Sequence, residues 1–452
     1  MRKITLESAD LHALVNETRE RQLDLGCRPI VLKNPPGFAI TAFVTDTEFQ
    51  SLQASRMCVC TAVDQEMPSA EARLRMVSHG NGFRAARRGS SNVGLTSGPY
   101  LTYDEIVGSL ERLSEAYPTS AELLRLPNIS VEGRPIFALR IGSAQGPNAK
   151  TATLVGGLHA QEWVPPDALV RFCSDLLESY RFGAGLQYGD CEIDASGVDT
   201  IIKNLQLLVL PCANPDGRVY SQTVDPNWRK NRARYSMEDG TICHGVDLNR
   251  NFDVVWDFAR HFARGFAHAS SKPSSYVYVG PSAVSEPETR NVVWLLDRFP
   301  DTRWYVDVHS YAPAVLHSWG IDSSQTVNRH ENFLNPSFDG WRGIPWDRRY
   351  GEFIEKADLE EAVRLSRLMS YAAQCVGGVR YRVRQAYSIY GTSGASDDYA
   401  YSRHRVNPSS GRILSFTLEC GREFQPELST REAVMREVGA ALAAFSLDVA
   451  AQ

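Results

Sequence analysis

One stretch of the sequence constrains the fold more than any other. An apolar run ends at two glycines, Gly156 and Gly157, and the chain then places His159 and Glu162 three residues apart. Two prolines follow, and residues 168–180 repeat apolar positions with the spacing of one helix face. Because proline is tolerated in the first turn of a helix, the stretch predicts a buried strand, a tight loop and a helix. A histidine and a carboxylate at a strand end can both turn toward one point.

Downstream of residue 100, the chain alternates strand and helix patterns. Helical periodicity predicts helices over residues 103–117, 168–180, 286–299, 359–375 and 430–447. Apolar runs predict strands over residues 151–158, 205–211, 304–309 and 413–418, and residues 129–141 predict a hairpin-like step. Strands separated by helices are typical of α/β proteins. We therefore expect a mixed, mostly parallel central sheet that is flanked by helices on both faces.

A change in composition divides the chain into two predicted domains. Residues 1–80 mix short strand and helix patterns and predict a small α/β N-terminal domain. Residues 81–99 are rich in glycine, serine and arginine without periodicity, which is typical of a linker. Residues 100–452 form the large α/β domain, and a chain of 452 residues is long enough for both.

Charge and hydropathy argue against two classes of partner. The formal net charge is −5 and no dense basic stripe occurs, so we expect no nucleic acid. No run of about 18 apolar residues occurs, so we expect no membrane insertion. The N-terminus lacks the apolar core of a secretory signal, and the 9 cysteines include no CxxC pair. We therefore expect a cytoplasmic protein with unpaired cysteines, and export by another route stays open.

Three side chains at strand ends predict a metal site. His159 and Glu162 follow the strand at residues 151–158, and His309 ends the strand at residues 304–309. Ligands of α/β sheets gather at the carboxyl ends of strands. Two imidazoles and a carboxylate are ligands that zinc prefers, and a catalytic zinc keeps a fourth position for water. Non-haem iron sites use the same ligand types and stay an alternative.

Polar residues elsewhere suit a substrate that carries a carboxylate. Asn249 and Arg250 stand side by side, and a guanidinium binds a carboxylate through two parallel hydrogen bonds. Arg229 lies in a second basic cluster and suits the stabilisation of an oxyanion. Glu419 ends the strand that begins at residue 413, and a carboxylate beside a zinc-bound water is the expected general base. No G-x-S-x-G motif supports a serine hydrolase.

Together these motifs resemble the zinc metallocarboxypeptidases of the pancreatic carboxypeptidase A/B type. The matching segments follow the order of that family from about residue 100 onward: Gly133-Arg134-Pro135, His159-x-x-Glu162, Asn214-Pro215-Asp216-Gly217, Trp228-Arg229-Lys230, Asp247-Leu248-Asn249-Arg250-Asn251, His309-Ser310-Tyr311, Ile389-Tyr390-Gly391 and Phe416-Thr417-Leu418-Glu419. The resemblance implies the fold of that family and an activity that removes the C-terminal residue of peptides or proteins.

The resemblance also implies roles for the reacting groups. His159, Glu162 and His309 are expected to hold one zinc ion per chain. Glu419 is expected to act as the general base that takes a proton from water. Arg229 is expected to polarise the carbonyl of the scissile bond.

Further residues are implied to bind the substrate. Its terminal carboxylate is expected to contact Asn249, Arg250 and Tyr390. Asp397 lies in a stretch similar to the floor of the side-chain pocket, where an acidic residue accompanies a preference for C-terminal Lys or Arg. Gln161 stands where an arginine is common in the family, which affects contacts further along the substrate.

Several features keep alternatives open. Residues 321–358 exceed the length the family needs and form either a rim loop or a surface excursion. Residues 1–80 suit a pro-segment that caps the active site, and a permanent accessory domain fits as well. Cys243 matches a position that forms a disulfide in secreted members, and we expect its partner to be missing. The alternative function is a zinc amidase acting on peptidoglycan peptides or polyglutamate side chains, and a non-catalytic relative ranks below it.

Overall fold

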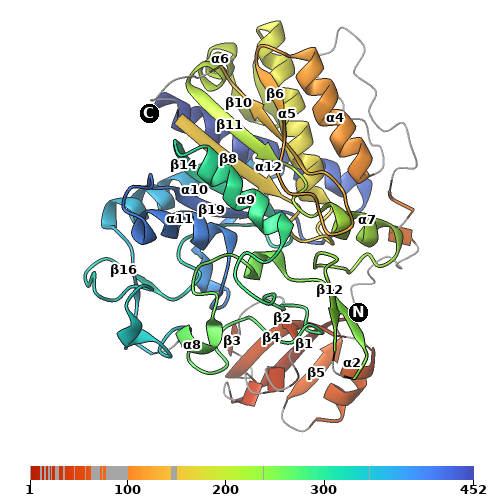
Figure 1. The fold of residues 1–452 in the computed structure, drawn as a ribbon, viewed down its shortest axis with the longest axis vertical. Coiled ribbons are helices and arrows are strands. Elements are labelled where there is room, and N and C mark those ends of the chain that lie inside the picture. Colours follow the sequence, from red (N-terminus) through yellow and green to blue (C-terminus); the bar gives the residue numbers. More distant parts are fainter. Residues whose placement is uncertain are drawn as a thin grey trace.

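The computed structural model shows an α/β protein with a central sheet of 8 strands (Figure 1). The structure describes residues 100–143, 150–237, 239–345 and 347–452, and from the N-terminal part residues 2–10, 13–14, 17–18, 21, 23–25, 30–33, 36–44, 46–55, 58–62, 72–73 and 75–77.

The sheet runs in the order β18-β15-β19-β14-β8-β11-β7-β6. These strands are β18 (Arg382–Gln385), β15 (Ala314–His317), β19 (Leu414–Glu419), β14 (Thr302–His309), β8 (Lys150–Gly156), β11 (Leu205–Leu210), β7 (Phe137–Ile141) and β6 (Ala121–Arg125). The central strands β19, β14, β8 and β11 are parallel, whereas β15 and β7 join them in antiparallel pairing. The prediction of a mixed, mostly parallel sheet is confirmed.

Helices cover both faces of this sheet. One layer contains α4 (Tyr103–Ala116), α5 (Val164–Phe182), α6 (Ala195–Asn204), α10 (Lys356–Gly377) and α12 (Leu428–Ala451). On the opposite face lie α9 (Pro287–Arg298) and α11 (Ser396–Val406), and α7 (Pro215–Thr223) follows β11 (Figure 1). Among the described residues, no helix is long and apolar enough to span a membrane.

The central strands divide their side chains between two cores. In β8, Leu154 belongs to the core beneath α5 and α12, whereas Val155 belongs to the core beneath α9. In β14, Val306 and Val308 face the first core and Tyr305 faces the second. Successive side chains of a strand point to opposite faces, so a strand buried on both sides is apolar throughout. This burial fixes the strand ends that carry the site.

The predicted strand, loop and helix around residue 157 are present. Gly157 has φ +68°, and a Cβ there would lie 3.2 Å from the Pro211 carbonyl oxygen, so the loop needs glycine. Helix α5 begins at Val164 with prolines in its first turn and ends before Gly183, which is left-handed. The helix therefore starts one turn before the periodic segment, because the prolines occupy that turn.

The predicted hairpin differs from the structure in its first strand. Strand β6 pairs with β7 and ends at Arg125, so residues 126–136 form the connection. Buried Asp216 organises this connection by accepting hydrogen bonds from Ser130 Oγ and the Glu132 amide, both at 2.7 Å. Arg134 pairs with the same carboxylate at 2.7 Å. Asp216, which belongs to a distant helix, therefore stabilises residues 126–136 as a loop, although their local sequence pattern predicted a strand.

The N-terminal part contains a small antiparallel sheet and a helix. The sheet runs in the order β2-β4-β1-β5, and β3 pairs with β4. Its elements are β1 (Arg2–Ser8), β2 (Asp24–Leu25), β3 (Ile30–Lys33), β4 (Pro36–Val44), α2 (Asp46–Gln53) and β5 (Val59–Ala62). A separate core includes Ile4, Leu6, Ile40 and Leu52. The predicted linker at residues 81–99 lies outside the described residues, and the domain boundaries stay predictions.

Candidate active site and metal centre

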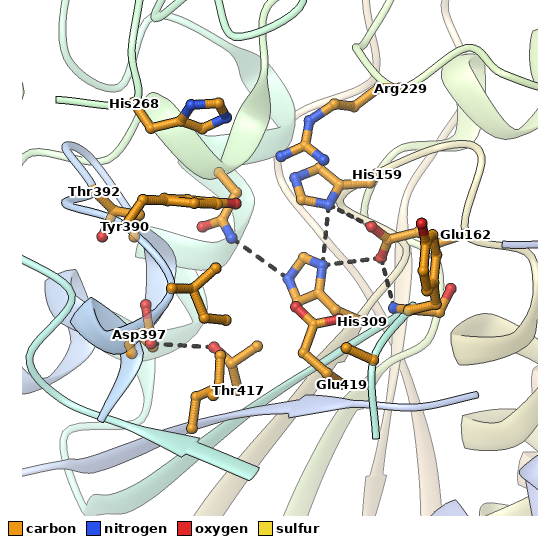
Figure 2. A pocket seen from close by; sticks show the side chains of 18 of the residues that line it. His159, Glu162, Arg229, His268, His309, Tyr390, Thr392, Asp397, Thr417 and Glu419 are labelled. Atoms are coloured by element: carbon orange, nitrogen blue, oxygen red, sulfur yellow. Dashed lines mark hydrogen bonds and ion pairs between the residues drawn. The ribbon is translucent and has the colours of Figure 1, made fainter. Parts of the chain in front are cut away.

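The structure brings the three predicted metal ligands together at the carboxyl ends of β8 and β14 (Figure 2). These strands are parallel neighbours, with Val308 opposite Gly156. The Nδ1 atoms of His159 and His309 lie 3.0 Å apart. Glu162 contacts both rings, at 2.7 Å from His159 Nδ1 and 2.9 Å from His309 Nδ1. Two ring nitrogens facing one carboxylate in a buried site form a donor set that suits zinc.

The charges in this cluster favour a cation. Burial alone would raise the pKa of Glu162, but the His159 and His309 rings outweigh burial and hold this pKa at about 2. Glu162 is therefore ionised at neutral pH, as a metal ligand must be. The Ser310 amide also donates to Glu162, at 3.0 Å.

An aspartate orients the first histidine. His159 Nε2 lies 3.2 Å from Asp247 Oδ1, so the ring directs Nδ1 toward the cluster. The other oxygen of Asp247 accepts from Arg229 Nε at 3.0 Å. Burial would lower the pKa of Arg229, but Asp247 raises it above its usual range. Arg229 therefore keeps a permanent positive charge beside the metal ligands.

Glu419 ends β19 and stands opposite His309 in the parallel pairing of β19 with β14. It lines the same pocket as the three ligands (Figure 2). Burial raises the pKa of Glu419 to about 8, and nearby His309 opposes this shift. A cation bound by the neighbouring ligands would favour the ionised form. The position therefore suits a group that takes up and releases a proton.

The predicted carboxylate-binding residues line another part of this pocket. Asn249 and Arg250 lie in a short 3₁₀ helix, η1 (Leu248–Arg250), and Arg250 Nε donates to the His268 carbonyl oxygen at 2.7 Å. Asn249 Oδ1 accepts from the Ser396 amide at 2.8 Å. The Tyr390 ring packs against His268 with centroids 4.3 Å apart. The side chains of Asn249, Arg250 and Tyr390, each of which can bind a carboxylate, therefore line the same part of the pocket.

Two neighbouring acidic residues at the start of α11 differ in what they contact. Asp397 lines the pocket, is 4% exposed and accepts from Thr417 Oγ1 at 3.1 Å (Figure 2). Asp398 points elsewhere, and both its oxygens lie 2.9 Å from the Gly320 amide. The pocket encloses about 940 Å³ including its open mouth, which is enough for an amino-acid side chain.

Sequence reasoning missed several residues of the pocket wall. His268 lines the pocket beside Tyr390, and burial together with Arg250 lowers its pKa to about 3, so the ring is neutral. The sequence around His268 is a polar loop with one histidine, and nothing in it indicates that the ring lines the pocket. Of the residues already named from the sequence, Gln161 also lines the pocket, and its side chain accepts a hydrogen bond from the Tyr276 hydroxyl.

The long segment at residues 321–358 packs beside the pocket without lining it. Its described residues contribute nothing to the pocket wall, which favours the surface excursion over the rim loop. Buried Arg342 donates to the carbonyl oxygens of Phe338 and Asn332 within the segment and to that of His261 outside it. Cys243 is free, as are the other cysteines that the structure describes.

Comparisons with known proteins agree with this geometry. The family model described as zinc carboxypeptidase, Peptidase M14, matches residues 106–439. Mast cell carboxypeptidase A of Mus musculus is 29% identical over 308 residues, which cover 67% of this chain and 60% of that protein. Carboxypeptidase B of Astacus astacus is 29% identical over 305 residues, covering 67% of this chain and 81% of that protein. Relatives of both A and B type occur, so the comparisons leave the side-chain preference open.

Solved structures share the fold over the whole chain. Carboxypeptidase A from Helicoverpa armigera has a TM-score of 0.72 at 21% identity and covers 100% of this chain and 97% of its own. Thrombin activatable fibrinolysis inhibitor has a TM-score of 0.69 at 19% identity and covers 100% of both chains. With the family match over residues 106–439 and a His-Glu-His cluster typical of one zinc ion, this chain belongs to the zinc carboxypeptidase family.

Proposed function

We propose that this protein is a metallocarboxypeptidase that removes the C-terminal residue of peptides or proteins, with a preference for Lys or Arg. The observation that carries the proposal is one pocket that combines the metal ligands, the Asn249–Arg250 pair and buried Asp397. A bound zinc ion would lower the pKa of a coordinated water and polarise a carbonyl oxygen. The remaining steps belong to side chains of this chain.

Glu419 acts as the general base. Its carboxylate takes the proton of the attacking water and then passes it to the amine of the departing residue. Arg229 stabilises the negative charge that develops on the carbonyl oxygen, because its guanidinium is held in place by Asp247 and remains charged.

Asn249, Arg250 and Tyr390 restrict the reaction to chain ends. Arg250 supplies a guanidinium for the terminal carboxylate, and its side chain is held in place because Nε donates to the His268 carbonyl oxygen and Nη1 to the Asn249 carbonyl oxygen. An internal peptide bond offers no carboxylate at this position, so binding selects the last residue of a chain.

Asp397 supports the preference for basic residues. Its carboxylate lines a pocket that is also lined by apolar Leu316 and Ala395, and such residues suit the aliphatic stem of a Lys or Arg side chain. Burial raises the pKa of Asp397. A substrate cation would favour its ionised form and pair with it away from water.

A hydrolysis panel tests this function. Peptides that differ only in a C-terminal Lys, Arg, Leu or Glu are compared with matched peptides whose terminal carboxylate is amidated, and with muropeptides. We expect the highest kcat/KM for Lys and Arg and no cleavage of the amides. Cleavage of amidated peptides would contradict the exopeptidase, and cleavage of muropeptides alone would favour the amidase.

We also propose that the N-terminal domain restricts access to the pocket. Arg73 Nη1 donates to Gln425 Oε1 at 2.9 Å and to Asn227 Oδ1 at 3.0 Å. Gln425 follows Phe424, which lines the pocket. A fragment of residues 98–452 should be much more active than the full chain, whereas equal activities would indicate an accessory domain instead.

A further inference from the structure

Strand β14 carries a second buried acidic residue two positions before the metal ligand His309. Side chains two residues apart on a strand share one face, so Asp307 and His309 lie together. His309 Nε2 lies 2.9 Å from Asp307 Oδ2, while Nδ1 of the same ring faces His159 and Glu162. Asp307 itself is fully buried and does not line the pocket.

The same oxygen of Asp307 also contacts the start of α11. Ser396 Oγ donates to Asp307 Oδ2, and the Ser396 amide donates to Asn249 Oδ1 at 2.8 Å. The next residue in the helix is Asp397. Asp307 therefore stands between the metal ligand and the loop and helix that carry the substrate-binding residues.

Asp307 is costly for the fold. Its second oxygen, Oδ1, is buried and has no hydrogen-bond partner in the described part of the chain. A buried carboxylate with one unsatisfied oxygen opposes folding, since its lost hydration is only partly replaced. Packing alone does not account for an acid here, because Tyr305, the preceding β14 side chain on the same face, belongs to an apolar core. The unfavourable burial of this carboxylate therefore points to a role for its negative charge beside His309.

We propose that Asp307 is a positioning residue for the zinc site. Its carboxylate holds the proton of His309 on Nε2, which leaves the Nδ1 lone pair directed at the metal and makes the imidazole a stronger donor. Asp247 has the corresponding place beside His159, but it also holds Arg229. Substituting Asp307 therefore tests the orientation of a zinc ligand without also releasing Arg229. The inference rests on the zinc site and not on the proposed Lys or Arg preference, so the two can fail separately.

The test measures zinc retention in the full-length zinc-loaded protein. Wild type, Asp307→Asn and Asp307→Ala are mixed with an excess of a chromogenic chelator, and the rate of zinc release and the zinc affinity are recorded. We expect Asp307→Ala to bind zinc about 10- to 100-fold more weakly. The zinc affinity of Asp307→Asn should lie between that of wild type and that of Asp307→Ala, because an amide oxygen can still accept a hydrogen bond from His309 Nε2 but carries no charge.

Two controls separate this role from a structural one. Ser396→Ala removes the hydroxyl contact to Asp307 and leaves the His309 contact in place, so zinc release should stay close to that of wild type. Asp175→Asn alters another buried carboxylate, which contacts Arg171 and Tyr188 away from the site, and should change thermal stability without changing zinc release.

If Asp307→Ala does not fold, the rate of zinc release from Asp307→Asn still tests the proposal. Faster zinc release in a variant with a native near-ultraviolet circular dichroism spectrum supports the proposal. If the folded Asp307→Asn protein is less stable but releases zinc at the wild-type rate, Asp307 is only structural and the proposal is overturned.

Discussion

Replacing Asp397 by asparagine changes one buried carboxylate of the pocket into an amide of the same size. The contact with Thr417 can persist, because the amide oxygen can accept the same hydrogen bond. What disappears is the negative charge that a substrate ammonium or guanidinium would meet. The side chain is only 4% exposed, so this pairing takes place largely away from water.

The size of the effect follows from this burial. Truncating one partner of a buried charge pair costs about 2 to 5 kcal/mol. The mouth of the pocket admits water, so we expect the lower part of that range, ~2 to 3 kcal/mol. At about 1.36 kcal/mol per tenfold change in rate, kcat/KM for C-terminal Lys should fall by ~30- to ~160-fold. A peptide ending in Leu loses no ion pair and should change by less than about threefold.

Steady-state kinetics on paired Lys and Leu peptides measure this ratio. Asp398→Asn is the matched control, because Asp398 binds the Gly320 amide and does not line the pocket. It should leave the Lys to Leu ratio of kcat/KM unchanged. Burial raises the pKa of Asp397, so the Lys preference of the wild type should weaken as the pH falls. If folded Asp397→Asn keeps the wild-type Lys to Leu ratio, the charge does not select the substrate and the pocket assignment is wrong.

Three further changes test other parts of the site and the fold. Glu419→Gln should lower kcat by about 10²- to 10⁴-fold while metal analysis still finds one zinc, since the amide cannot take a proton; near wild-type kcat would exclude Glu419 as the base. Arg250→Ala should raise KM much more than it lowers kcat, because the terminal carboxylate loses its guanidinium, and an unchanged KM would contradict that contact. Burial raises the pKa of Glu288 from 4.5 to about 8, so its contribution to stability is complete below pH 4.5 and is lost as the pH rises through 8. Glu288→Gln should therefore gain stability relative to wild type at pH 9 and not at pH 4, as measured by thermal unfolding; a pH-independent difference would refute this.

The regular elements were largely predictable because their patterns are local. The five predicted helices downstream of residue 100 occur as α4, α5, α9, α10 and α12, and the four predicted strands occur as β8, β11, β14 and β19. The first hairpin strand was misplaced, because Asp216 from a distant helix organises residues 126–136. The short helix α11 was not predicted, since its few apolar positions show little periodicity.

By itself, the sequence determined the types of group at the strand ends. Glycines and prolines around residue 157 and apolar strands before His159, His309 and Glu419 are local features, and local features fix where a side chain leaves an element. Only the tertiary structure decided which strands are neighbours, so it alone brought the two histidines within 3.0 Å. It also decided that Asp397 lines the pocket while Asp398 binds Gly320, because the direction of each side chain depends on how α11 packs against the sheet.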